Sequence, residues 1–262
     1  MIKMKILPLL VIYLFLTVKP VFADYSTTLH SYIGLTDYYR TTYQSYQVSK
    51  NKYLTYGTLT SQKEAMENGR NFLKARDQLV MLYLQLLNDR INEGGGFDSQ
   101  QKDLYLSQLN VEWNWLSNHR SSYDSISTLI DLQRSSDQMQ ERYNTVVRYI
   151  ALKTAGVILT NKAYITTTSL NDILQRLTEQ MKIISQTGAD LTIAERWLIE
   201  AGNKTNYATL KQSDAMTIFV NFHGENIVSE YNKGLNLLTE SNQYLREANS
   251  YLSEILRIIK GE

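Results

Sequence analysis

Side chains that are mostly apolar recur at alternating steps of four and three residues through the C-terminal stretch. This spacing places them on one face of an α-helix. The row consists of Tyr231, Leu235, Leu238, Asn242, Leu245, Asn249, Leu252, Leu256 and Ile259. A second row with the same steps, about 100° around the axis, consists of Leu237, Ser241, Tyr244, Ala248, Tyr251, Ile255 and Ile258. Because two faces need two neighbours, we predict a bundle of at least three helices rather than a two-stranded coiled coil.

The rest of the chain permits the same architecture. Its two prolines are Pro8 and Pro20, so residues 24–262 contain none, and nothing there removes a helical hydrogen bond by that route. Similar three-four rows run through 65–90, 129–153 and 174–201. We therefore predict an all-α fold, an elongated antiparallel bundle of about five to seven long heptad-patterned helices. Residues 24–262 are expected to form one helical-bundle domain.

Two segments weaken the helical pattern. Residues 157–168 are rich in β-branched side chains, and residues 216–222 alternate apolar with other residues, so each is either helix or a short irregular or strand segment. Helix is favoured for the second segment because it has no convincing strand partner. Gly94-Gly95-Gly96 is expected to end a helix. Whether residues 97–167 form one helix or two stays open, since no Gly or Pro forces a break near 119–125.

The first 23 residues have the pattern of a secretory signal peptide. Lys3 and Lys5 precede a thirteen-residue apolar run from Ile6 to Val18, and the small-residue ending Val21-Phe22-Ala23 predicts cleavage after Ala23. This run is short for a membrane span, which needs about 20 residues. We expect an exported protein, periplasmic, cell-surface or extracellular, that is membrane-anchored only if the leader stays uncleaved.

The composition excludes several classes of function. The chain has no cysteine, which rules out disulfides, thiolate metal sites and a lipid-modified cysteine. Without the three leader lysines, 24 basic residues face 26 acidic ones, a formal charge of −2 that gives no reason to expect a nucleic-acid partner. No later run reaches about 18 uncharged apolar residues, so we expect no membrane span after signal cleavage.

Aromatic residues supply the candidate binding positions. Five tyrosines stand seven residues apart in the first mature helix: Tyr25, Tyr32, Tyr39, Tyr46 and Tyr53. Such a column suits packing at a bundle surface, and the alternative is an exposed platform for a sugar, peptide or polymer. Trp113 and Trp115 stand two residues apart in the sequence. This spacing places them roughly 200° apart around a helix, so the two rings cannot share a face. The candidate binding residues are Tyr32, Tyr39, Tyr46, Trp113 and Trp115.

Catalytic and metal-binding patterns are missing. His30, His119 and His223 lie in different elements with no second histidine within four residues, so no helical metal pair is present. No GxSxG, SxxK or nucleotide-binding glycine pattern occurs. We expect no metal, no cofactor and no enzyme activity, although spacing alone does not reveal a serine that folding brings to a base.

The expected function follows from long helices without catalytic motifs. We expect an exported helical bundle with a structural or protein-interaction role at or outside the cell envelope, whose partner is a protein or an envelope component. Self-association through an exposed helix face stays open. The first alternative is a small-ligand or carbohydrate-binding module that uses the Tyr/Trp-rich faces. The second is an unrecognised hydrolase.

Overall fold

The computed structural model describes residues 23–222 and 226–260, and these residues are almost entirely helical. The α-helices are α2 (Ala23–Tyr56), α3 (Leu59–Glu93), α4 (Ser99–Ser122), α5 (Leu129–Arg142), α6 (Arg148–Ser185), α7 (Thr192–Val220) and α8 (Ile227–Lys260). A 3₁₀ turn, η1 (Tyr123–Ser125), follows α4, and a π-helical turn, η2 (Tyr143–Val147), joins α5 to α6. No strand occurs in the described part of the chain, so the predicted all-α class is confirmed.

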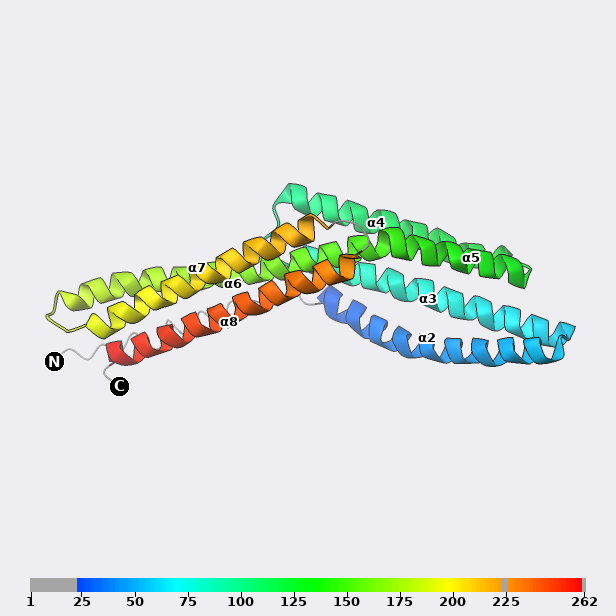
Figure 1. Ribbon diagram of the computed structural model, residues 1–262, viewed down its shortest axis with the longest axis horizontal. Coiled ribbons are helices and arrows are strands. Elements are labelled where there is room, and N and C mark those ends of the chain that lie inside the picture. Colours follow the sequence, from blue (N-terminus) through cyan, green and yellow to red (C-terminus); the bar gives the residue numbers. More distant parts are fainter. Residues whose placement is uncertain (1–22, 223–225, 261–262) are drawn as a thin grey trace.

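The molecule is elongated and has two halves (Figure 1). Helices α2 to α5 form one half, and α6 to α8 form the other. The helices α5 (14 residues), η2 (5 residues) and α6 (38 residues) follow one another without a gap, as 57 consecutive helical residues. At 1.5 Å per residue this path is about 85 Å long. It connects the two halves and determines the length of the molecule.

Helix α8 confirms the prediction of two apolar faces. Leu238, Leu245 and Leu252 of the first row are buried, and so are Ala248 and Ile255 of the second. Helix α8 packs along both α7 and α6, which supply the two neighbours that the double row requires. The two asparagines of the first row are exposed at the edge of the bundle.

Both segments with an alternative strand interpretation are helical up to Val220. Residues 157–168 lie inside α6, where Val157, Thr160 and Thr167 are buried at helical spacing. The fully buried ring of Phe219 lies between Gly156 of α6 and Gly234 of α8. A Cβ added at either glycine would come within 3.0 Å of the ring. Tertiary packing therefore decides the conformation here, against the weak β preference of the sequence.

Residues 97–167 form more than one helix. Helix α4 ends in the 3₁₀ turn, and the chain reverses before Thr128, whose hydroxyl oxygen accepts a hydrogen bond from the Asp131 amide at 3.1 Å and caps α5. From Leu129 the path is continuous through η2 into α6. At the other connection, Gly94 ends α3, and its amide donates to the Arg90 carbonyl at 2.8 Å.

The half made by α6, α7 and α8 contains a buried polar contact. Gln212 of α7 is fully buried, and its side-chain amide donates to Thr167 Oγ1 of α6 and Ser241 Oγ of α8, each at 2.8 Å. A buried amide bonded to both neighbours fixes the relative register of three helices, because any shift would leave it unpaired.

The predicted signal peptide, residues 1–23, lies outside the described residues except for Ala23, which begins α2.

Candidate functional site

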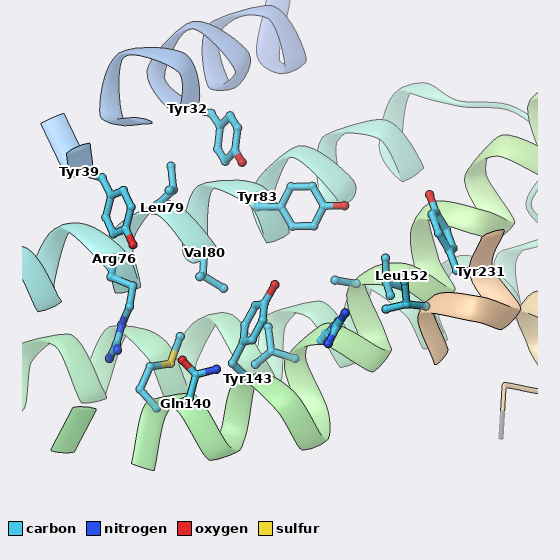
Figure 2. A pocket seen from close by; sticks show the side chains of 15 residues that line it. Tyr32, Tyr39, Arg76, Leu79, Val80, Tyr83, Gln140, Tyr143, Leu152 and Tyr231 are labelled. Carbon is cyan, nitrogen blue, oxygen red and sulfur yellow. The ribbon is translucent and has the colours of Figure 1, made fainter. Parts of the chain in front are cut away.

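A pocket lies where the two halves of the molecule meet, and we call it the waist pocket (Figure 2). Its volume is about 530 Å³, within the range of roughly 300–1,000 Å³ usual for small-molecule sites. It is lined by Tyr32 and Tyr39 of α2, Arg76, Leu79, Val80 and Tyr83 of α3, Met139 and Gln140 of α5, Tyr143 and Val147 of η2, Arg148, Ala151 and Leu152 of α6, and Val228 and Tyr231 of α8. Helices from both halves therefore contribute to one cavity.

The π-helical turn η2 forms one wall of the waist pocket. The Arg148 amide donates to the carbonyl of Tyr143, five residues earlier, instead of the usual four. This longer step widens the helix and changes the direction of the side chains around it. Tyr143, Val147 and Arg148 all line the cavity. Turns of this type inside α-helices are frequent at functional sites.

Five tyrosines surround the cavity, and their hydroxyls have no hydrogen-bond partner within residues 23–222 and 226–260. Tyr32 and Tyr143 approach it from opposite sides, with Tyr83 between them and Tyr231 at one end (Figure 2). None of these four hydroxyls, nor that of Tyr39, forms a hydrogen bond with another described residue. A tyrosine hydroxyl in a partly apolar site normally bonds to protein or water. These groups are therefore available to a ligand or to water.

The hydroxyls of Tyr83 and Tyr231 stay protonated at neutral pH. Burial, with smaller contributions from the nearby hydroxyls of Tyr231, Tyr32 and Tyr143, raises the pKa of Tyr83 to about 12. Burial also raises the pKa of Tyr231. A protonated phenol is both a donor and an acceptor, so the pocket offers neutral hydrogen-bonding groups rather than negative charge.

The two arginines of the waist pocket have different surroundings. The guanidinium of Arg76 is occupied: it donates to Ser136 Oγ at 3.0 Å and to Tyr123 Oη at 3.2 Å, and its Nε lies 3.3 Å from Asp77 Oδ1. The half-buried Arg148 side chain has no hydrogen bond or ion pair with any residue of the described ranges. No Asp or Glu of the described residues lines the cavity. The pocket therefore contains one positive charge without a partner in the described part of the chain.

The predicted candidate residues do not gather at one place. Tyr32 and Tyr39 line the waist pocket, whereas Tyr46 lies along a second hollow of about 310 Å³. Tyr46 stacks on Phe72 of α3 with ring centroids 5.5 Å apart and an interplanar angle of 4°. Tyr46 therefore packs α2 against α3, whereas Tyr32 and Tyr39, nearer the start of α2, border the waist pocket.

The two candidate tryptophans also lie apart from the waist pocket. Trp113 packs against the central hydrophobic core. Trp115 stacks on His119 at a centroid distance of 4.8 Å, and the guanidinium carbon of Arg142 lies 5.2 Å from the Trp115 ring centroid. Trp115 packs against the same core as Trp113, and it contacts His119 and Arg142 in addition.

Three of the pocket tyrosines were not among the candidates. Tyr83, Tyr143 and Tyr231 each belong to a three-four row in its own helix, so the sequence marks them only as packing positions. Arg148 carries no sequence signal at all. Tyrosines that recur on several predicted helix faces are a signal that would have selected these three residues. That signal does not show that the three rings meet in one cavity.

A buried polar cluster, Asp77–His119–Ser135, has the order of groups found in serine hydrolases. His119 Nδ1 lies 2.7 Å from Asp77 Oδ2, and His119 Nε2 lies 3.1 Å from Ser135 Oγ. The same Nε2 is also 3.1 Å from the Ser135 carbonyl, and Ser135 is buried inside α5, where its own amide belongs to the helix. A serine nucleophile needs access and free amide donors for the oxyanion. We interpret the cluster as a structural link between α3, α4 and α5.

An exposed apolar surface lies at the far end of the α2–α5 half, and we call it the apolar tip. Leu54, Tyr56 and Leu59, at the α2–α3 turn, have exposed fractions of 69%, 69% and 67%, and Ile130 at the start of α5 reaches 73%. Leu54 and Leu129 line the same hollow, which places the two turns side by side. Figure 1 shows both turns at one end of the molecule.

In the described ranges no three or more His, Asp or Glu side chains are placed to hold a metal ion. The same ranges contain no helix long and apolar enough to span a membrane. Comparison of the chain with protein-family models, with curated proteins and with solved structures finds no match. We therefore infer function from the geometry of the chain.

Proposed function

We propose that this protein is an exported interaction scaffold, a helical rod that contacts a protein or an envelope component at or outside the cell envelope. The observation that carries this proposal is the apolar tip at the end of an elongated molecule. Four large apolar side chains that are two thirds or more exposed belong to the two turns at that end. Because contiguous apolar surface is unfavourable in water, such patches often mark interaction sites.

The length of the molecule supports the same role. The continuous path from Leu129 to Ser185 keeps the two ends of the rod about 85 Å apart. A partner held at the apolar tip is thereby separated from anything bound near the other end. A rod of this kind can bridge or space two components.

The interaction is tested with a photoreactive amino acid incorporated at Ile130 in the native host. Ile199 of α7 is a matched control, because it is also an exposed isoleucine, at 63%, but lies in the other half. We expect a defined cross-linked species from position 130 that is absent from position 199. Replacing Leu54 and Leu59 by serine should remove it. Equal cross-linking at both positions, or none at 130, would refute the proposal, and a species at twice the chain mass would identify the partner as a second copy.

The export part of the proposal depends on residues 1–23. Mass spectrometry of the protein recovered from envelope and medium fractions should give a chain that begins at Asp24. A chain retained in the cytoplasm with its leader intact would contradict export. A chain found in the membrane fraction with residues 1–23 still attached would instead indicate an anchored form.

A second candidate function is the binding of a small ligand in the waist pocket. The specific observation is a cavity of about 530 Å³ that contains five tyrosine hydroxyls and one guanidinium, none of which bonds to a side chain or backbone group that the structure describes. Cavities that combine apolar walls with a few convergent polar groups are the usual form of a ligand site.

A further inference from the structure

We infer that the waist pocket binds a small carboxylate with an apolar body, with Arg148 as the group that holds the carboxylate. This inference rests on the second candidate function and specifies its ligand. Three properties of the cavity support it: its charge, its apolar walls and its hydroxyls.

The charge of the cavity favours a monoanion. Arg76 and Arg148 are the two charged residues in the lining, and Asp77 already faces Arg76. The half-buried guanidinium of Arg148 has no counter-charge among the described residues. An unpaired charge that is partly removed from water is unfavourable, and an anion in the cavity would relieve this. The planar guanidinium fork matches the two oxygens of a carboxylate.

The walls of the cavity favour an apolar body of limited size. Seven of the fifteen lining residues are aliphatic or Met: Leu79, Val80, Met139, Val147, Ala151, Leu152 and Val228. Tyr32 and Tyr83 add aromatic surface, with ring centroids 6.2 Å apart. These side chains come from both halves of the molecule. A ring or a short hydrocarbon chain would therefore be removed from water on several sides.

The hydroxyls provide further donors for the carboxylate or for a polar substituent. Tyr83, Tyr143 and Tyr231 approach the cavity from three different elements, α3, η2 and α8 (Figure 2). Because no carboxylate among the described residues lines the cavity, an acidic ligand meets no fixed like charge from them. A neutral ligand of the same shape would use the walls and the hydroxyls but would leave Arg148 unpaired.

The test compares three probes with one shared body: 4-phenylbutyrate, 4-phenylbutan-1-ol and 4-phenylbutylamine. Binding to the purified protein is measured by isothermal titration calorimetry at neutral pH. We expect the acid to bind at least about tenfold more tightly than the alcohol, and the amine to bind most weakly, because a charge-assisted hydrogen bond is stronger than a neutral one. Raising the salt concentration should weaken binding of the acid and leave the alcohol unchanged.

Variants connect the preference to the pocket. Arg148→Gln should weaken binding of the acid about tenfold or more and leave the alcohol unchanged. Arg176→Gln on the same helix is the matched control, since Arg176 is exposed and lies outside the cavity lining. Val228→Trp should block all probes by filling the cavity from its exposed rim. Arg148 has no side-chain hydrogen bond or ion pair with a described residue, so its loss should leave the helical circular dichroism unchanged.

The outcomes separate the ligand class from the binding function. If acid and alcohol bind equally well, or if Arg148→Gln keeps the preference for the acid, the carboxylate inference is wrong while the pocket still binds. If none of the three probes binds the wild-type protein, both this inference and the second candidate function are refuted.

Discussion

Phe219 gives the sharpest test of the packing between α6, α7 and α8. Its ring is fully buried, and it approaches Gly156 and Gly234 on the two neighbouring helices. A Cβ at position 156 would come within 3.0 Å of three ring carbons, and one at position 234 within 3.0 Å of two. Both added Cβ atoms would approach Cε1 of this fully buried ring, so the ring has little room to move away from either. We therefore expect Gly156→Ala to destabilise the protein.

The size of the effect follows from two opposing contributions. Alanine is a better helix former than glycine by about 1 kcal/mol, which favours the variant. Overpacking a rigid core costs about 1–3 kcal/mol, and more where the neighbour cannot move. Because the added Cβ would overlap three carbons of a fixed ring, the overpacking cost of Gly156→Ala lies at or above the upper end of the range of about 1–3 kcal/mol. After the gain of about 1 kcal/mol in helix propensity is subtracted, we expect a net loss of about 2 kcal/mol in the free energy of unfolding.

The measurement is urea unfolding followed by circular dichroism, with a matched control. Gly202 lies in the interior of α7, and a Cβ there would have no neighbour within 4 Å, so Gly202→Ala should stabilise the protein by up to about 1 kcal/mol. In a protein that already carries Phe219→Ala, Gly156→Ala should lower the free energy of unfolding much less than in the wild type, because the ring that the added Cβ would overlap is absent. The reasoning is refuted if Gly156→Ala and Gly202→Ala shift the midpoint in the same direction, or if the cost persists without the ring.

Four further predictions concern shape, pH, a buried ion pair and catalysis. Small-angle scattering should give a radius of gyration of about 25 Å or more, against roughly 18 Å for a compact domain of this length. Burial raises the pKa of Tyr83 from 10.0 to about 12. The contribution of this shift to the free energy of unfolding is therefore fully present below pH 10 and is lost as the pH rises toward 12. Tyr83→Phe should abolish this part of the alkaline loss of stability, as measured by urea unfolding at about pH 9 to 12. Arg142→Met removes a guanidinium that donates to both oxygens of the buried Glu112, at 2.7 and 2.9 Å, and should cost about 3–5 kcal/mol, whereas Arg134→Met at an exposed ion pair should cost less than about 1 kcal/mol. Ser135→Ala should leave any background hydrolysis of p-nitrophenyl acetate unchanged; turnover that depends on Ser135 would restore the hydrolase alternative.

The helices themselves could be predicted from the sequence because their signal is local. Side chains that share a helix face are three or four positions apart, so the rows of α8 are visible without knowledge of any partner. The number of neighbours also followed, since two apolar rows cannot both be covered by one helix. The break between α4 and α5 left only a weak signal, because the reversal uses a 3₁₀ turn and a threonine cap rather than Gly or Pro.

Local preference failed where tertiary packing was stronger. Residues 157–168 have a composition typical of strands, yet they are helical because Val157, Thr160 and Thr167 are buried at helical spacing and Thr167 bonds to Gln212 of α7. A difference of a few tenths of a kcal/mol per residue in propensity is small compared with the burial of a ring such as Phe219. The sequence contains the two glycines that this ring approaches, but it does not show that contact.

The binding sites depended still more on the tertiary structure. The tyrosine column was visible in the sequence, but only Tyr32 and Tyr39 of the candidate residues border the waist pocket. Their pocket neighbours Tyr83, Tyr143 and Tyr231 are far away in the chain. Periodicity determined which face of each helix is apolar, because that is a property of a few adjacent turns. Which faces meet, and the unpaired Arg148 they enclose, was decided only by the docking of the two halves, because contacts between residues distant in the chain leave no periodic trace in the sequence.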